Sequence, residues 1–286
     1  MGKVNHKILY AVYSICVTLF FLYYLFPSIT IKEFLLSKIG RMAPGLSVSI
    51  EDVRPAFPIG LKFVNVSIQN SGKPFMDANR LSITPGLLSL LAGKIAIDID
   101  CEVYEGMIEA TIGLGGKDFL VNTADVELDH IQIGDILFLK DHFPHDASGS
   151  LDGRVNYKKG EDNRNTFIGD LVLSELVIDF SSSLHGLDKL NLQKIEANFE
   201  SNRSEVKLNR FVNMGGDVDG SLSGTILINR RIEKSVLNLS GTVNPNPVFT
   251  DKLGKLGPVV KRLLKKSSGE GFPVKLQGTF EKPRFF

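Results

Sequence analysis

The 286-residue sequence is poor in cysteine and contains no tryptophan. Its two cysteines are Cys16, within a long apolar segment, and Cys101, far outside it. The two thiols are therefore not expected to meet, and no disulfide within the chain is predicted. This cysteine usage neither requires nor excludes an oxidising compartment.

The chain also lacks an excess of either charge. Its 33 Lys and Arg residues face 32 Asp and Glu residues, which leaves a net charge of +1. Proteins that bind nucleic acid usually carry a basic patch and a strong basic balance. We therefore expect no nucleic-acid partner and no strongly acidic partner.

Motifs that carry chemistry are missing from the sequence as well. There is no GxSxG elbow, no Walker loop and no HExxH pair. His142 and His145 in DHFPHD could share a metal with Asp141 and Asp146. However, Pro144 breaks helical spacing between the histidines, and no cysteine joins them, so a solvated loop is the better interpretation. We predict no enzyme, no cofactor and no metal site.

One long apolar run is present, and no second run approaches its length. It extends from Ile8 to Phe26 without a charged residue and ends at Pro27. A helix of this length spans about 28 Å, close to the hydrocarbon core of about 30 Å. Lys3 and Lys7 precede the run and favour a cytoplasmic N-terminus. The run is long for a signal peptide and no small-residue cleavage site follows it, so an uncleaved anchor is predicted.

The residues predicted to form this anchor are large, and tyrosines stand at both of its ends. Tyrosine side chains at the ends of a span can reach the lipid headgroups with their polar tips. The predicted anchor residues are Ile8, Tyr10, Tyr13, Leu19, Phe20, Tyr23, Tyr24 and Phe26. The chain after Pro27 would lie on the far side of the membrane.

Residues 31–42, IKEFLLSKIGRM, have apolar residues at helical spacing with Lys and Arg between them. Two arrangements fit this amphipathic pattern. The helix could lie on the membrane surface just beyond the anchor. It could equally cover one end of a sheet.

From residue 46 onward the dominant hydrophobic period is two, with Gly, Asn, Asp or Ser between short apolar runs. This pattern predicts many short antiparallel strands with one dry face and one wet face. A shift of phase near Val64 suggests a bulge. The clearest run is Ile95 to Val103, in which the odd-numbered residues are predicted to be shielded and Asp98, Asp100 and Glu102 to be exposed.

Two short helices are expected to interrupt the strands. Residues 85–92, PGLLSLLA, open with a proline suited to the first helical turn. Residues 247–266 have helical spacing, and Gly254, Gly257 and Pro258 could break this helix into two pieces. Its basic end could contact anionic headgroups, although a solvated helix end is the simpler interpretation.

A short Leu-x-Gly pattern recurs near the C-terminus, at Leu222, Leu239 and Leu276. In a strand, a leucine and a glycine two residues later share one face. Glycine at that place lets the sheet bend sharply or lets another backbone approach. The recurrence predicts a sheet that is curved repeatedly in the same sense.

The strands with the clearest alternation supply the candidate residues of an apolar groove. These candidates are Ile97, Ile99, Leu222, Ile226, Leu239 and Leu276. The sequence is compatible both with an open groove and with a closed sandwich, because both need an uncharged inner face. The glycines favour the groove through the curvature that they allow.

Two stretches near the start of the predicted β region have a distinctive residue pattern. Residues 44–68 read PGLSVSIEDVRPAFPIGLKFVNVSI, with Pro55, Pro58 and Gly60 at their centre. Residues 81–90 follow the pattern Leu-x-Ile-x-Pro-x-Leu-x-x-Leu. The chain then closes with GFPVKLQGTFEKPRF.

Together these elements resemble type II secretion system protein N, GspN, in its longer form. The closing tail is similar to the ends of the wider AsmA-like group. The resemblance covers both ends of the chain and the general texture of its middle, while residues 113–165 match no pattern that we can name.

The resemblance implies a mainly β protein with a long, half-rolled antiparallel sheet and an apolar groove. It implies residues 1–7 in the cytoplasm, an inner-membrane anchor over 8–27, a juxtamembrane amphipathic helix over 28–43 and a periplasmic β domain over 44–286. The implied partners are membrane lipid and other secretion-system proteins.

Two functions follow from these expectations. The first is an anchored accessory of the type II secretion system that could also bind lipid. The second is a lipid-binding or lipid-transfer module that acts in envelope lipid homeostasis independently of secretion.

Overall fold

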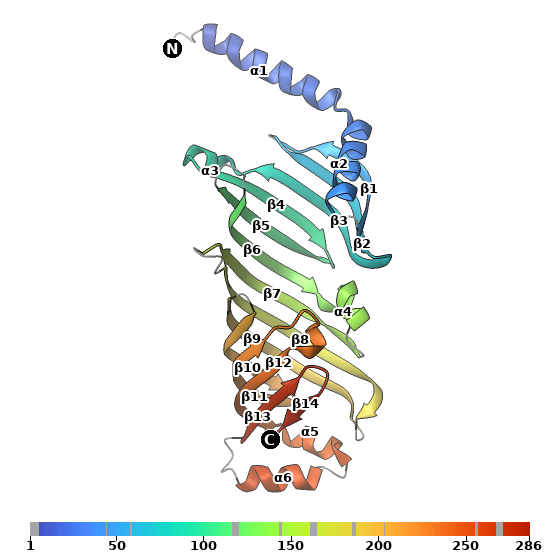
Figure 1. Ribbon diagram of the computed structural model, residues 1–286, viewed down its shortest axis with the longest axis vertical. Coiled ribbons are helices and arrows are strands. Elements are labelled where there is room, and N and C mark those ends of the chain that lie inside the picture. The colour runs from blue at the N-terminus through green and yellow to red at the C-terminus, as the bar shows by residue number, and fades with distance from the viewer. Residues whose placement is uncertain are drawn as a thin grey trace.

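The computed structural model describes residues 6–43, 45–57, 59–115, 120–142, 145–160, 165–184, 187–202, 204–254, 257–266 and 271–286. It consists of one open sheet of 14 strands, in which every strand pairs antiparallel with the next strand along the chain. The sheet twists along the long axis of the molecule (Figure 1). With 63% of the residues in strands, the prediction of a mainly antiparallel β protein is confirmed.

All strands except the three-residue β14 are longer than the mean strand, and most are joined by short connections. In order they are β1 (Leu46–Pro55), β2 (Leu61–Asn70), β3 (Lys73–Pro85), β4 (Ile95–Val103), β5 (Gly106–Gly115), β6 (Leu120–Gln132), β7 (Asp146–Lys158), β8 (Thr166–Leu184), β9 (Leu187–Asn202), β10 (Glu205–Gly216), β11 (Val218–Leu227), β12 (Val236–Pro245), β13 (Phe272–Thr279) and β14 (Pro283–Phe285). Such a meander needs only local connections, because antiparallel neighbours can be joined by tight turns.

The helices lie at the ends and at the rims of the sheet. The described α-helices are α1 (His6–Tyr24), α2 (Ser28–Met42), α3 (Leu87–Leu91), α4 (Leu137–His142), α5 (Pro247–Lys252) and α6 (Gly257–Lys266). Short 3-10 turns occur at Ile133–Asp135 and Ile232–Lys234. The segment 247–266 is indeed divided, while α4 was not predicted, because its six residues are too few to establish a helical period.

Bulges interrupt the ladders of several strands. At the predicted phase shift Asn65 has a φ of 48°, but the pairing of β2 with β1 and with β3 keeps one register on both sides of it, so no residue is inserted there. His130 and Glu175 have similar positive φ values and lie where the pairing of β6 and of β8 shifts. A bulge strengthens the right-handed twist of a strand and re-aims the side chains that follow it. The bulges therefore explain why an apolar side chain is separated from the next by two residues at these points.

Helix α2 packs against the end of the sheet. Ile31, Leu35 and Leu36 contact the apolar side chains of the first strands, and Phe26, just before α2, joins them. Lys32 Nζ also donates to the backbone oxygen of Glu51, at 3.0 Å. The helix therefore covers one end of the sheet, which is one of the two arrangements that its amphipathic pattern predicted.

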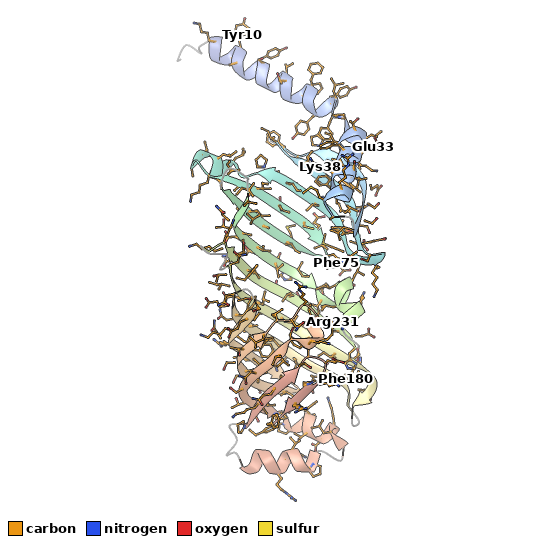
Figure 2. The ribbon with its side chains drawn as sticks, in the orientation of Figure 1. Tyr10, Glu33, Lys38, Phe75, Phe180 and Arg231 are labelled. Carbon is orange, nitrogen blue, oxygen red and sulfur yellow. The ribbon has the colours of Figure 1, made fainter. Side chains whose placement is uncertain are left out.

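Helix α1 precedes α2 and extends beyond the sheet, with Tyr10 lying away from the strands (Figure 2). Tyr13, Phe20 and Tyr24 are exposed as well, whereas Tyr23 and Phe26 are half-buried. The side chains of Ile8 and Leu19 lie outside the described part of the structure. Among the described residues, no helix combines the length and the hydropathy that a membrane crossing requires.

Strand β4 follows the predicted alternation only in part. Cys101 and Val103 are buried and Asp100 is exposed, as predicted, but Ile95 is exposed and Ala96 is buried. Ala96 lies against Gly86, at the start of the connection that forms α3. The connection therefore covers the polar face at this end of β4. The alternation of the strand alone predicts that this face is exposed to solvent.

Two clusters of buried side chains form the core, and both lie on one face of the sheet. The N-terminal cluster consists of Ile50, Val53, Phe63, Val66, Ala78, Cys101, Val103 and Ile131. The central cluster consists of Ile133, Leu176 and Ile195. Ile136 and Leu151 pack against both clusters and join them.

Candidate apolar binding face

One face of the sheet carries apolar side chains in register from strand to strand. A single row of paired positions illustrates this face, and it crosses the sheet from β1 to β13. The row consists of Val53, Phe63, Leu81, Cys101, Ile108, Leu128, Gly153, Leu171, Ala197, Phe211, Leu222, Gly241 and Val274. No polar side chain interrupts this row, and we call the face that contains it the apolar face.

The next row of paired positions lies on the opposite face and is polar throughout. It consists of Arg54, Lys62, Ser82, Asp100, Glu109, Glu127, Arg154, Asp170, Asn198 and Arg210. Arg154 and Glu127 form an ion pair of 2.6 Å on this face. Because successive side chains point to opposite sides of a strand, the two rows separate apolar from polar residues from β1 to β10.

The six predicted groove residues all lie on the apolar face, but at two separate places. Ile97 and Ile99 lie on β4, whereas the other four lie on β11, β12 and β13. Leu239 pairs directly with Leu276. At about 4.8 Å between strands, the β4 pair is about 34 Å along the sheet from β11. The residues therefore belong to one face but not to one compact site.

Burial separates the two ends of the apolar face. The N-terminal cluster is covered by α2, and α4 folds back from β6 until it contacts β3. Strands β9 to β13 make extended contacts only with neighbouring strands within the described residues. On this part of the apolar face Leu222, Ile226 and Leu276 are half-buried, whereas Ile195, Leu237 and Leu239 are buried. A continuous apolar surface of this kind is uncommon on a monomer unless something binds to it.

Glycines replace larger side chains on the uncovered part of the apolar face. Gly224 has a φ of +143°, and a side chain there would meet the backbone of Asn238 and Leu239. Gly241 likewise leaves no space for a Cβ against Ser221 and Leu222. These glycines belong to the recurring Leu-x-Gly pattern, so the pattern marks places where neighbouring backbones approach closely.

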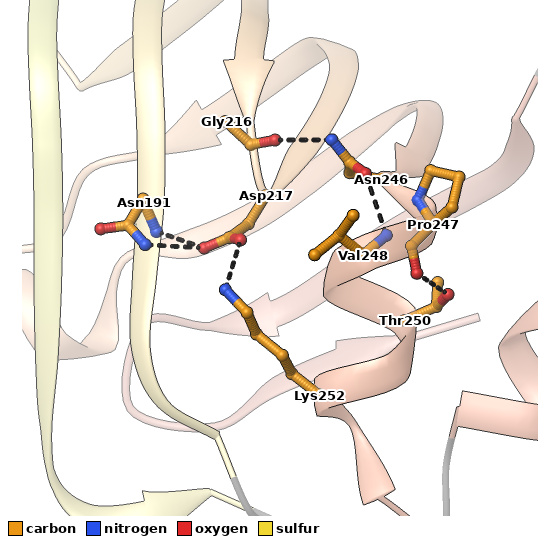
Figure 3. A network of polar contacts seen from close by, with 8 residues as sticks. All are labelled: Asn191, Gly216, Asp217, Asn246, Pro247, Val248, Thr250 and Lys252. Carbon is orange, nitrogen blue, oxygen red and sulfur yellow. Dashed lines mark hydrogen bonds and ion pairs between the residues drawn. The ribbon is translucent and has the colours of Figure 1, made fainter.

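A polar network fixes helix α5 to the end of the strands near the C-terminus (Figure 3). Asp217, which is buried, accepts hydrogen bonds from Asn191 N at 2.8 Å and Nδ2 at 3.1 Å, and Lys252 Nζ lies 3.5 Å from its other oxygen. Asn246 caps α5 by accepting a hydrogen bond from Val248 N at 3.0 Å. The buried carboxylate is thus paired, as a charge removed from water must be.

The sequence did not identify one cluster that the structure brings together on the polar face. His130 Nδ1 lies 2.6 Å from Asp129 Oδ1 and 3.4 Å from Asp152 Oδ1, and their ligand atoms could hold a metal. The hydrogen bond to Asp129 and the charge of Asp152 raise the pKa of His130. Asp129 and His130 are exposed, and exposed acidic groups often lie together without a metal, so a hydrogen-bonded cluster is the simpler description.

Asp152 could be assigned to this cluster only from the pairing of β6 with β7, which no local signal specifies. Of the predicted DHFPHD loop, residues 143–144 and the side chains of Asp141 and His142 lie outside the described residues. His145 packs edge-on against Phe180, with ring centroids 5.1 Å apart.

Neither protein-family models nor curated proteins nor solved structures gave a significant match to the chain.

Proposed function

We propose that the chain is a membrane-anchored module that holds the acyl chains of lipids against the apolar face of its sheet. The main support is the uncharged row of positions that runs from β1 to β13, together with the half-exposed side chains of Leu222, Ile226 and Leu276, whose strands make extended contacts with no helix among the described residues. Acyl chains suit such a surface because they need only apolar contact and no specific polar partner.

The energetics favour exchange of lipid over permanent capture. Burying a 16-carbon chain at about 0.8 kcal/mol per methylene gains about 13 kcal/mol relative to water. The bilayer that the lipid leaves is equally apolar, so most of that gain cancels. A lipid on the apolar face is therefore expected to return readily to a membrane.

The anchor and the compartment are part of the same proposal. Tyr10, Tyr13, Phe20 and Tyr24 of α1 are exposed, and a helix that presents such side chains outward suits a lipid environment. The inner membrane, with residues 44–286 in the periplasm and the sheet forming a half-rolled groove, follows from the resemblance to GspN and the AsmA-like group.

Lipid contact can be tested by photocrosslinking in cells with the full-length protein. A photoreactive residue at Leu222 should crosslink to phospholipid, whereas the same residue at Ser223 should not. Ser223 is the matched control because it is the next residue in β11, is exposed and points to the opposite face. Equal lipid labelling at both positions, or none at Leu222, would reject lipid binding by the apolar face.

The second candidate function is an accessory of the type II secretion system that binds partner proteins through its sheet edges. The observation that favours it is the open sheet, which leaves β1 and β14 as edge strands. An edge strand presents unpaired backbone groups to which another chain can add a strand. Crosslinks to secretion-system proteins from Leu46, an exposed residue of the edge strand β1, without lipid crosslinks from Leu222, would favour this function over lipid binding.

A further inference from the structure

An exposed apolar tip lies at one rim of the sheet. It is formed by the β1–β2 connection, by helix α3 and by the start of β4. The tip residues are Phe57, Ile59, Leu87, Leu90, Leu91 and Ile95, and all are exposed. Leu91 is 87% exposed and Phe57 is 78% exposed. Phe57, Ile59 and Leu87 line the rim of one hollow, so the two connections lie beside each other, and Asp98, Asp100 and Glu109 of the polar face line the same hollow.

The chemistry of the tip matches a lipid surface. The connection GLLSLLAG, residues 86–93, contains no charged residue. The first charge after it is Lys94, which is exposed. Leucines and an aromatic ring that enter the acyl region with a lysine at headgroup level are the arrangement of an interfacial membrane segment. A patch of exposed large apolar side chains is costly in water and indicates a binding surface.

The position of the tip points to the same bilayer as helix α1. Helix α3 lies at the end of the molecule that also carries α1 and α2, while α5 and α6 lie at the other end (Figure 1). The apolar face begins directly behind the tip, where Pro85 pairs with Ile97 and Ile83 pairs with Ile99. The tip therefore lies at the rim where the sheet begins, with the α3 connection against the polar face and Ile97 and Ile99 on the apolar face beside it.

We propose that this tip inserts into the surface of the phospholipid bilayer in which α1 is anchored. Insertion places the first strands of the apolar face at the lipid surface, where an acyl chain can pass from the bilayer to the sheet. This inference deepens the proposed function and rests on it for the role of the tip, although insertion itself can be measured separately.

The absence of tryptophan from the chain makes a direct test possible, because one introduced tryptophan is the only one in the protein. The full-length variant Leu91→Trp is reconstituted into vesicles of phosphatidylcholine and phosphatidylglycerol. Replacing the phosphatidylcholine by its brominated form should quench the tryptophan fluorescence severalfold. Phe57→Trp should give the same result from the other connection of the tip.

Ile232→Trp is the matched control. Ile232 is 52% exposed, lies in the β11–β12 connection and is separated from the tip by most of the sheet. Quenching that is equal at Leu91 and Ile232, or weak at both Leu91 and Phe57, overturns the proposal. Circular dichroism of each variant establishes that the sheet is retained.

The lipid that the purified protein carries before it is placed in vesicles is measured by mass spectrometry. This measurement keeps the two proposals apart. Strong quenching at Leu91 in a protein that carries no lipid supports insertion of the tip and counts against lipid binding by the apolar face. Bound lipid without quenching at Leu91 and Phe57 supports lipid binding and rejects the tip.

Discussion

The two halves of the sheet have the same period but are covered differently. In the N-terminal half the apolar face is covered by α2 and by the return of α4, so that Val53, Phe63 and Val103 are almost inaccessible to solvent. In the C-terminal half the equivalent positions include Leu222, Gly241 and Val274, and no helix within the described residues makes extended contacts with their strands. Helices of the chain itself cover the apolar face of the first half, whereas part of the apolar face of the second half stays half-exposed.

This difference shows that the alternation of a strand specifies which of its faces is apolar. It does not specify which element covers that face. Phe63 and Phe211 belong to the same row of the apolar face, yet Phe63 is buried and Phe211 is half-buried. The neighbouring helix decides the difference. The predictions below test this contrast, beginning with the largest expected effect.

Truncating the two phenylalanines should affect stability unequally. Phe63→Ala should lower the free energy of unfolding by about 3–5 kcal/mol, because it opens a cavity in a covered core. Phe211→Ala should cost less than half of that in lipid-free protein, because its ring is already partly in solvent. Denaturant unfolding of the full-length protein in detergent measures both. Similar losses for the two variants would remove the contrast between the halves.

The glycines of the uncovered half should tolerate no side chain. Gly224→Ala should cost about 2–4 kcal/mol, because it combines an unfavourable φ with overpacking against the backbone of β12. Gly40→Ala is the control, since Gly40 lies within α2 and has open space around it. That change should stabilise the protein by about 0.5–1 kcal/mol. Thermal unfolding distinguishes the two, and a neutral Gly224→Ala would refute the close backbone approach.

The polar network at the end of the uncovered half should contribute a smaller amount. Asp217→Ala should lower the free energy of unfolding by about 1–3 kcal/mol, because Asn191 and Lys252 lose the buried carboxylate that they bind. Asp251→Ala removes only an exposed ion pair with Lys261 and should cost about 0–1 kcal/mol. Hydrogen exchange should also rise over 246–252 in Asp217→Ala alone. Unchanged exchange there would mean that Asp217 does not fix α5.

The smallest effect is expected at His130 in the covered half. Its pKa is raised in the folded protein by the hydrogen bond to Asp129 and the charge of Asp152. The cluster therefore stabilises the fold fully below the unfolded histidine pKa, and the contribution is lost as the pH rises through the folded pKa. His130→Asn, which retains a residue that accepts a positive φ, should lower the Tm at pH 5.5 more than at pH 8.5. An equal change in Tm at both values contradicts the charged cluster, and an NMR titration of His130 measures the pKa directly.

Local chemistry predicted much of the fold. The alternation of Ile97 and Ile99 with Asp98 and Asp100 assigned the side chains to the two faces, since the side-chain period of a strand is fixed by its backbone. The Leu-x-Gly pattern at Leu222 marked the close approach of β11 and β12. The candidate site was predicted only as a set of residues on one face, because their distribution between β4 and β11 depends on the order of all the strands between.

The sequence by itself determined a mainly β chain, its apolar and polar faces and the positions of its principal helices, because each follows from the conformation of a few adjacent residues. Only the tertiary structure decided that α2 covers β1, that α4 returns to β3 and that Asp152 meets His130. Those arrangements join residues far apart in the chain, and their free energy depends on burial and charge that exist only after the strands have paired. The uncovered half of the apolar face, on which the proposed function rests, is a consequence of that assembly.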